Sequence, residues 1–279
     1  MDHDITVQLF DILTDAAGQY DTAFGPAQFL TAGRIGDIAM AHVSKDRVAR
    51  GDRVRLRLIN PSVDRIYEIA ISGVSAAIIA LDGMPVATPR AFETVVLAPG
   101  QRCDVIGDVN GPVVLTDIAK GGGQYLGVIA LDGSRTPSNA PLPGLEQNAM
   151  PKPDPKAQHV TLVMQGGAGG AVHKGFGGWA LNDTSGLPQQ PFIDVRRGAT
   201  VRISLRNDTA FDHVMHLHGH HFWELDQDGG RGDYRDGTLV RAGKARDILC
   251  VLDNPGAWMF HCHMLSHQAD GMATWVLVR

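Results

Sequence analysis

Residues 48–60 read VARGDRVRLRLIN, and residues 195–207 read VRRGATVRISLRN. Seven of these thirteen positions are identical without a gap, at a constant separation of 147 residues. Two further pairs match at a separation of 143, namely Gly100 with Gly243 and Asp104 with Asp247. Strand-and-turn segments often look alike, but an ungapped match of this extent indicates a repeated unit. The sequence therefore predicts that one domain is present twice.

The regions around both copies read as short strands separated by turns. β-branched or alternating runs recur between clusters of Gly, Pro, Asn and Asp, at residues 54–59, 66–71, 94–97, 160–164, 201–205 and 248–252. Runs of this length and density are typical of a β-sandwich or barrel. Long helical periodicity is hard to find. We therefore predict an all-β fold.

A proline-rich segment divides the chain. Between Ser134 and Gln158 there are six prolines, at positions 137, 141, 143, 151, 153 and 155. Proline cannot donate a hydrogen bond to a β-ladder, so this density indicates an extended linker. The predicted organisation is a domain at 1–135, a linker at 136–157 and a second domain at 158–279.

The composition narrows the class of protein. The 279 residues are 44% hydrophobic and 20% charged, with a formal net charge of −5, which indicates a soluble globular protein. A mildly acidic chain argues against nucleic acid as the main partner. No apolar run approaches the roughly 20 residues of a membrane span, and no signal peptide is visible at the N-terminus. Three cysteines cannot build a disulfide framework.

The histidines are concentrated in a small part of the chain. Eight of the 12 fall between His213 and His267, in the segments HVMHLHGH at 213–220 and HCHMLSHQADGM at 261–272, and in the dipeptide at 220–221. In a strand, residues two apart share a face, so His216 and His218 point to the same side. In the same way His261 and His263 share a face, and Cys262 points to the opposite face. His213 lies an odd number of residues before His216 and belongs on the side of the thiolate.

This arrangement predicts a copper site on the thiolate side. One thiolate, two imidazoles and one weak thioether, from His213, Cys262, His267 and Met272, form the ligand set of a blue-copper electron-transfer centre. Zinc also binds cysteine and histidine, but methionine is not among its usual ligands. Zinc would also leave the four histidines of the other face unexplained.

The first half of the chain carries none of these ligands. At a separation of 147, the histidines at 213, 216 and 218 fall on Ile66, Ile69 and Ile71, and a slip of one residue moves them to Tyr67, Ala70 and Ser72. At a separation of 145, the histidines and cysteine at 261–263 fall on Thr116, Asp117 and Ile118. The sequence therefore predicts two copies of the fold, of which only the second carries the metal ligands.

The two histidine segments resemble the third and fourth copper-binding motifs of the multicopper oxidase family, which includes laccase-like and bacterial copper-resistance-type enzymes. The stretches RDGTLV at 235–240 and DNPGAWMF at 253–260 resemble the strands that lead into the fourth motif. The first half is similar to the copper-free middle domain of that family, through RVRLRLIN at 53–60, ALDG at 80–83 and LAPG at 97–100. The resemblance implies two cupredoxin-like Greek-key domains, the second and third of the family without the first.

The resemblance also implies roles for individual residues. His213, Cys262, His267 and Met272 would bind type 1 copper. His216 would bind type 2 copper, and the type 3 pair would be bound by His218, His261 and His263. Electrons would pass from Cys262 into its neighbours His261 and His263. All three residues are expected to be catalytic.

The sequence departs from the family pattern in three ways. A complete trinuclear cluster needs eight histidines, and the four of the first domain are missing, so this chain carries a partial type 2/type 3 site. Val214 stands where the motif usually has proline. Gln268 follows His267 where many relatives have an acid, and Asp270 lies nearby. The isolated histidines at 3, 42, 159 and 173 are expected to be surface or core residues, and those at 220 and 221 neighbours of the site.

The expected function is one-electron oxidation of phenols or metal ions, coupled to reduction of O2 to water. The partners expected are O2, a small reducing substrate, and either a missing cupredoxin domain or a symmetry-related subunit that completes the cluster. The family suggests a periplasmic or extracellular location. The alternative is a non-enzymatic copper-binding or electron-transfer protein, and the substrate cannot be read from the sequence.

Overall fold

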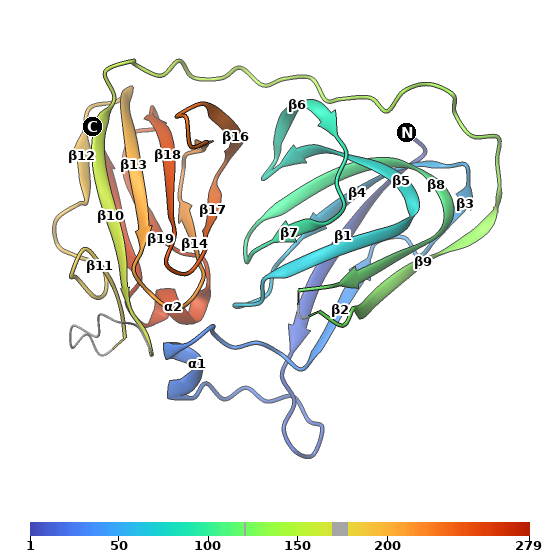
Figure 1. The fold of residues 1–279 in the computed structure, drawn as a ribbon, viewed down its shortest axis with the longest axis horizontal. Helices are drawn as coiled ribbons and strands as arrows, with labels where there is room; N and C mark the ends of the chain where they lie inside the picture. The colour runs from blue at the N-terminus through green and yellow to red at the C-terminus, as the bar shows by residue number, and fades with distance from the viewer. Residues whose placement is uncertain (120, 169–177) are drawn as a thin grey trace. The chain divides into compact units, whose positions relative to one another are not determined.

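A computed structural model describes residues 1–119, 121–168 and 178–279. The chain divides into two compact units (Figure 1). The N-terminal unit comprises Met1–Thr22 and Ile35–Asn148, and the C-terminal unit comprises Ala23–Arg34 and Ala149–Arg279. The short segment Ala23–Arg34 thus belongs with the second unit, although it lies in the first part of the sequence. Residues 136–157, the predicted linker, contain neither helix nor strand.

Strands form most of both units, as the all-β prediction requires. The N-terminal unit contains β1 (His3–Ile12), β2 (Ile38–Val43), β3 (Arg47–Arg50), β4 (Arg53–Ile59), β5 (Tyr67–Leu81), β6 (Met84–Arg90), β7 (Val95–Leu97), β8 (Arg102–Asp117) and β9 (Gln124–Ser134). The C-terminal unit contains β10 (Gln158–Gly166), β11 (Trp179–Leu181), β12 (Ile193–Val195), β13 (Ala199–Asn207), β14 (His213–Leu217), β15 (Phe222–Leu225), β16 (Arg231–Arg235), β17 (Gly237–Val240), β18 (Ala245–Leu252), β19 (Gly256–Cys262) and β20 (Ala273–Val278). All six predicted strand segments lie in or overlap these strands.

Helix is scarce in the described residues. The two helices, α1 (Pro26–Leu30) and α2 (Leu265–Ala269), have five residues each. They lie next to each other in the C-terminal unit (Figure 1). Within the described ranges no helix is long and apolar enough to span a membrane.

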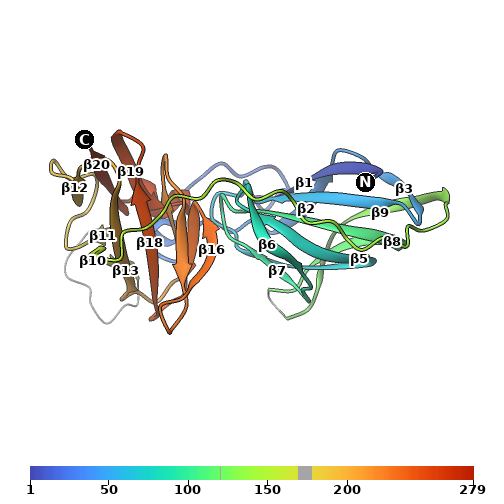
Figure 2. The same ribbon diagram turned by 90° about the horizontal axis from the view of Figure 1, so that it is seen from above.

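The C-terminal unit is a sandwich of two sheets (Figures 1 and 2). One sheet has the strand order β11-β10-β13-β18-β15-β16, and the other has the order β12-β20-β19-β14-β17. Strands that are neighbours in a sheet are often distant in sequence, as in a Greek key. This topology brings β14 and β19 side by side, so the two histidine segments meet although 38 residues, 218–255, separate their strands.

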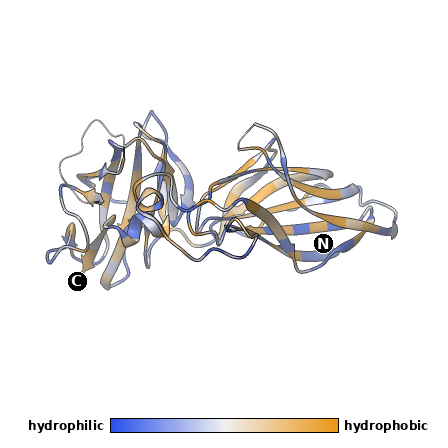
Figure 3. Cartoon of the chain, turned by 90° about the horizontal axis from the view of Figure 1, so that it is seen from below, coloured by the Kyte–Doolittle hydropathy of each residue, from blue (hydrophilic) through white to orange (hydrophobic). Residues whose placement is uncertain are grey.

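The nine described strands of the N-terminal unit are hydrogen-bonded into a single sheet, and its strands β5 and β8 are longer than any in the C-terminal unit. The sheet follows the order β2-β1-β4-β8-β5-β6, with β7 paired to β5 and β9 paired to β3 and β8. The strands β5 and β8 pair along almost their whole lengths, with register shifts near Gly73 and Ile79. Hydrophobic and hydrophilic residues alternate along the strands (Figure 3), and the inward-facing side chains form a single buried core.

The strand pairing confirms the repeat predicted from sequence. In the N-terminal unit Arg57 of β4 is paired with Asp104 of β8, and in the C-terminal unit Ser204 of β13 is paired with Asp247 of β18. Arg57 and Ser204 are 147 positions apart, and Asp104 and Asp247 are 143 positions apart. These are the same separations that align the two halves of the sequence. The Arg55–Asp104 ion pair of one unit is matched by an Arg202–Asp247 ion pair in the other.

A glycine at the same place in each repeat forms the turn before the matched strand. Gly51 has φ 88° and Gly198 has φ 85°, a left-handed conformation that favours glycine. A Cβ atom at Gly51 would lie 2.4 Å from the carbonyl oxygen of Arg135. The identical glycines therefore reflect a requirement of the backbone.

Candidate metal centre

The strands β14 and β19 place the histidines and the cysteine on two opposite faces. Met215 is paired with Cys262, and His216 is paired with His261. Because side chains alternate along a strand, His213 lies on the face of Cys262, and the paired imidazoles of His216 and His261 lie on the other. This confirms the predicted division into a thiolate side and an imidazole side.

On the thiolate side, three donor atoms converge in the interior. The Sγ atom of Cys262 lies 3.8 Å from Nδ1 of His213 and 3.8 Å from Nδ1 of His267. The two Nδ1 atoms are 3.0 Å apart. All three residues have no exposed surface. His267 reaches this position from α2, which begins two residues after His263.

Hydrogen bonds on the far side of each imidazole determine which nitrogen carries the proton. Nε2 of His267 lies 2.7 Å from the carbonyl oxygen of Thr31, which can only accept. Nε2 of His213 lies 2.8 Å from the hydroxyl of Thr209, whose own proton is directed to Oδ1 of Asn207 at 2.7 Å. Each Nε2 therefore donates, and each Nδ1 presents a lone pair.

This donor set fits a metal ion. Two nitrogen lone pairs 3.0 Å apart repel each other unless a cation lies between them. A thiolate beside two imidazoles, buried and held by hydrogen bonds on their outer sides, is the arrangement that soft transition metals require. The residues His213, Cys262 and His267 therefore form a preorganised metal site.

Met272 is held next to this site through its backbone. Its carbonyl oxygen accepts a hydrogen bond of 3.0 Å from the amide of Cys262, and its amide donates to the carbonyl of His267 at 2.9 Å. Its side chain is fully buried. The backbone thus ties the fourth residue predicted from sequence to two of the other three.

The structure adds two components that sequence reasoning missed. The indole of Trp179 contacts both imidazoles, with ring centroids 4.8 Å from His213 and 4.4 Å from His267. Its Nε1 donates to the carbonyl of Phe29 at 2.5 Å. The segment Ala23–Arg34 thus supplies two carbonyls, of Phe29 and Thr31, to the surroundings of the site. No motif in residues 23–34 indicated this role.

On the opposite face, a second group of imidazoles comes together. His216, His218 and His261 each offer a nitrogen, and these atoms lie within 4.8 Å of one another. Nε2 of His218 and Nε2 of His261 are 3.0 Å apart. The ring of His263 lies 5.3 Å from that of His216 and 5.7 Å from that of His261. The four histidines predicted on this face are therefore brought together.

Backbone carbonyls orient this second group. Nδ1 of His216 donates to the carbonyl of Asp236 at 2.8 Å, and Nδ1 of His261 donates to the carbonyl of Cys262 at 2.8 Å. Each ring therefore presents a bare Nε2 to the cluster. His218 is exposed, His216 is half-buried and His261 is buried, so this group opens to the surface.

Two family models, both described as "Multicopper oxidase", match the chain over residues 8–114 and 150–279. The chain belongs to the multicopper oxidase family. Solved structures share the fold: Lac15 from a marine microbial metagenome is 40% identical with a TM-score of 0.81, covering 99% of this chain and 66% of that one. A multi-copper oxidase from Pseudomonas thermotolerans is 24% identical with a TM-score of 0.84, covering 99% and 68%. These likenesses confirm the predicted pair of cupredoxin-like domains.

Curated members of the multicopper oxidase family match at lower identity. The multicopper oxidase MmcO of Mycobacterium tuberculosis is 29% identical over 262 residues, covering 88% of this chain and 49% of that protein. Laccase-1 of Botryotinia fuckeliana is 25% identical over 277 residues, covering 80% and 48%. The chain spans about half the length of the curated relatives it matches. Copper is the metal expected in this family, and the group of His213, Cys262 and His267 suits a type 1 site.

Burial lowers the pKa of three of these imidazoles in this multicopper oxidase chain. It lowers the pKa of His267 to about 4, although the hydrogen bond to Thr31 opposes the fall. It also lowers the pKa of His261 to about 4, and neighbouring imidazoles add to the effect. Burial and then the nearby His267 hold the pKa of His213 well below its ordinary value. Imidazoles bind metal only when neutral, so these three are ready to bind at neutral pH.

The remaining histidines have other contacts. Nε2 of His3 lies 3.1 Å from Asp52, and Nε2 of His159 lies 2.7 Å from the hydroxyl of Ser204. His42 is exposed on β2, and His173 lies outside the described residues. His220 is buried against Trp258, with ring centroids 5.8 Å apart, and His221 stacks on Tyr234 at 5.5 Å.

The other predicted side chains near the site are also placed by the structure. Cys250 of the C-terminal unit and Cys103 of the N-terminal unit are buried and form no disulfide, and burial raises the pKa of Cys250. Asp270 follows α2, and burial raises the pKa of its carboxyl group. Its carbonyl oxygen accepts a hydrogen bond of 3.0 Å from the amide of Trp179. Gln268, within α2, is partly buried.

Proposed function

We propose that this chain is the electron-accepting part of a copper oxidase that oxidises phenols or metal ions one electron at a time and reduces O2. In this proposal His213, Cys262, His267 and Met272 hold type 1 copper. Copper bound there would supply reversible one-electron transfer, because sulfur ligands favour Cu(I) and imidazoles suit Cu(II). The protein contributes a dry site whose donors are fixed before the metal binds.

The observation that carries the proposal is the position of one tripeptide between two clusters. Cys262 directs its Sγ to the buried group, while His261 directs its ring to the opposite group, and both lie on β19. One peptide bond joins them, and another joins Cys262 to His263. The tripeptide therefore gives a covalent route from the electron-accepting site to the imidazole face.

The imidazole face supplies half of an oxygen-reducing cluster in this proposal. His216 would serve type 2 copper, and the type 3 pair would be served by His218, His261 and His263. Four further imidazoles are needed for a complete cluster. They would come either from a further cupredoxin domain or from a symmetry-related subunit that apposes its own four histidines. A periplasmic or extracellular location is part of the same proposal.

The test is copper loading of the full chain, followed by measurement of its blue absorption, its O2 consumption with a reducing phenol and its oligomeric state. We expect a monomer to bind one blue copper and to consume O2 at no useful rate. We expect turnover in an assembly that completes the cluster, and loss of turnover when it dissociates. A His159→Ala variant serves as control, because this exposed histidine lies in the same unit but outside both clusters.

Other outcomes would change the proposal. Turnover by a verified monomer would refute the half-cluster. A blue protein that never consumes O2 in any assembly would favour the second candidate function, a non-enzymatic copper-binding or electron-transfer protein. The complete enclosure of the thiolate site within one unit is the observation that favours this alternative.

A further inference from the structure

The N-terminal unit repeats the loop that supports the metal site of the C-terminal unit. Nδ2 of Asn207 donates to the carbonyls of Phe211 and Val240, and Nδ2 of Asn60 donates to the carbonyls of Arg65 and Leu97. Oδ1 of each asparagine accepts the amide two residues later, at 3.0 Å in both units. The two loops therefore make the same hydrogen bonds, with Arg65 in the place of Phe211 and one more residue in the N-terminal loop.

Strand register extends the correspondence to the ligands themselves. His213 is paired with Val240, and Tyr67 is paired with Leu97. Cys262 is paired with Met215, and Asp117 is paired with Ile69. Tyr67 thus takes the place of His213, and Asp117 takes the place of Cys262.

The fourth ligand position corresponds in the same way. Met272 accepts the amide hydrogen of Cys262, and Gln124 is paired with Asp117. Gln124 thus takes the place of Met272. The position of His267 has no counterpart in this register, because that residue lies on α2, whereas β8 ends at Asp117 and β9 begins at Gln124.

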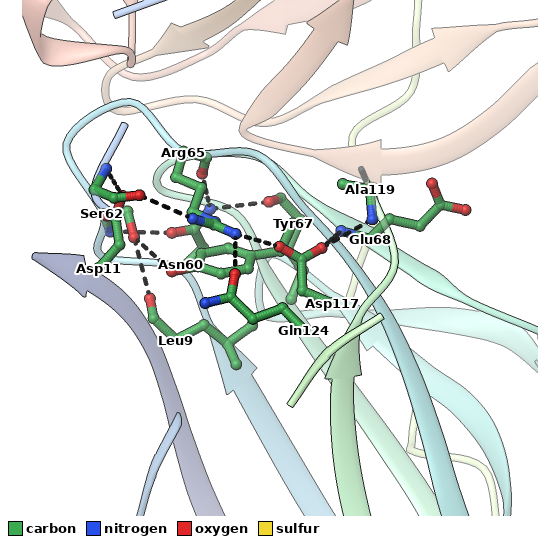
Figure 4. Close-up of polar contacts among 12 residues, drawn as sticks. Leu9, Asp11, Asn60, Ser62, Arg65, Tyr67, Glu68, Asp117, Ala119 and Gln124 are labelled. Atoms are coloured by element: carbon green, nitrogen blue, oxygen red, sulfur yellow. Dashed lines mark hydrogen bonds and ion pairs between the residues drawn. The ribbon is translucent and has the colours of Figure 1, made fainter. Parts of the chain in front are cut away.

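The hydroxyl that orients the first ligand is also conserved between the units. Thr209 bonds His213 in one unit, and in the other the hydroxyl of Ser62 lies 3.3 Å from that of Tyr67. Figure 4 shows Tyr67, Asp117 and Gln124 gathered around a single side chain, that of Arg65. The N-terminal unit therefore has a counterpart for three of the four proposed ligand positions, with different residues.

The Arg65 guanidinium contacts all three of these counterparts. Its Nη2 donates to Oδ2 of Asp117 at 2.8 Å and to Oε1 of Gln124 at 2.8 Å (Figure 4). Its carbon lies 5.1 Å from the centre of the Tyr67 ring. The arginine is 5% exposed and Asp117 is 4% exposed. A buried carboxylate needs a cation beside it, and here the chain supplies one.

We propose that the Arg65 guanidinium is a built-in replacement for a type 1 metal ion, occupying in the N-terminal unit the place that the metal takes in the C-terminal unit. Asp117 supplies the negative charge of the thiolate, Gln124 supplies the weak donor and Tyr67 supplies the aromatic ring. A guanidinium is always charged and donates in fixed directions, so it satisfies this set without any metal supply. This inference rests on the proposed type 1 ligands. In the test of Arg65, however, copper serves only to mark the unfolding transition of the C-terminal unit.

The first experiment removes the cation and adds it back. Arg65→Ala should lower the unfolding temperature of the N-terminal unit in the full chain. Millimolar guanidinium, far below denaturing concentrations, should then raise it, whereas sodium at equal ionic strength should not. Copper loading identifies the transitions, because copper raises only that of the C-terminal unit.

The matched control is Arg57→Ala, which removes an arginine that makes two hydrogen bonds to Asp4 on the surface of the same unit. Its unfolding temperature should fall less and should not respond to guanidinium. If sodium rescues Arg65→Ala equally well, or if guanidinium also raises the control, the proposal is overturned.

The second experiment installs metal ligands and does not depend on rescue. In a Cys262→Ser background, the triple change Arg65→Ala, Tyr67→His and Asp117→Cys should bind one Co(II) with added imidazole. Binding should produce thiolate-to-cobalt charge-transfer absorption, since the C-terminal unit has then lost its own thiolate. The control keeps Arg65 and carries the other three changes. It should show no such absorption, because the guanidinium occupies the place of the metal. Equal cobalt binding with and without Arg65 would contradict the proposal even if Arg65→Ala alone fails to fold.

Discussion

Nε2 of His267 donates a hydrogen bond of 2.7 Å to the carbonyl oxygen of Thr31, which lies 236 residues earlier in the chain. This bond fixes the proton on Nε2 and leaves Nδ1 free to face Cys262. Because a carbonyl oxygen can only accept a hydrogen bond, the imidazole is held in the tautomer that binds metal through Nδ1. The segment Ala23–Arg34 is therefore part of the metal centre of the C-terminal unit.

Replacing Cys262 by serine should abolish the intense blue colour of the copper-loaded protein, because that absorption is charge transfer from the thiolate to copper. The Sγ atom lies 3.8 Å from both imidazole nitrogens, and the other two cysteines, Cys103 and Cys250, do not belong to this group. Visible absorption spectra check this. Cys250→Ser is the control and should stay blue, since that buried thiol contacts the carbonyl of His221. A blue Cys262→Ser protein would disprove the assignment.

Met272→Leu should retain copper and raise the reduction potential of the site. The backbone of Met272 is held by Cys262 and His267 whatever its side chain, so the loop should keep its position. Loss of a weak axial thioether withdraws electron donation from Cu(II) more than from Cu(I). Redox titration followed through the blue band measures the shift. Loss of the copper, or a fall in potential, would show that Met272 is not a weak axial ligand.

Thr209→Val should weaken copper binding by about tenfold to a hundredfold, the usual effect of removing a hydrogen bond from a metal-binding histidine. The variant leaves the buried Nε2 of His213 without its 2.8 Å acceptor, which costs about 1–3 kcal/mol of folding free energy. Competition with a copper chelator and urea unfolding give the two values. Ser62→Ala removes the corresponding hydroxyl of the N-terminal unit and should leave copper affinity unchanged. Equal effects of the two variants would argue against a role in positioning the ligand.

The copper-free protein should lose stability as the pH falls from about 6.5 to about 4. Folded His267 and His261 take up protons only near pH 4, whereas unfolded histidines do so near pH 6.5, so the unfolded state binds more protons in this range. The difference of about 2.5 pH units corresponds to at most about 3 kcal/mol for each residue. Urea unfolding across this range measures the slope. His267→Gln should flatten it, whereas His159→Gln should not, and an unchanged slope in His267→Gln would contradict the proposed cause.

Much of the candidate site could be predicted from the sequence because it depends on local geometry. Alternation along a strand places Cys262 opposite to its neighbours, and the repeat separations of 147 and 143 residues recur in the strand pairing. The partner strand could not be predicted in register. The sequence allowed two alignments of the first half with the second, which match His213 with Ile66 or with Tyr67. The structure selects Tyr67, because Tyr67 is paired with Leu97 as His213 is paired with Val240.

The sequence by itself determined the all-β class, the duplication, and the division of ligands between two faces. These follow from residue spacing, since a strand turns its side chains by a fixed amount at each step. Only the tertiary structure decided which distant groups complete each site. The carbonyl of Thr31, which follows α1, and the indole of Trp179, on β11, reach the C-terminal centre, and the Arg65 side chain fills its counterpart. Contacts of this kind depend on how loops pack and where long side chains point, and neither leaves a periodic pattern in the sequence.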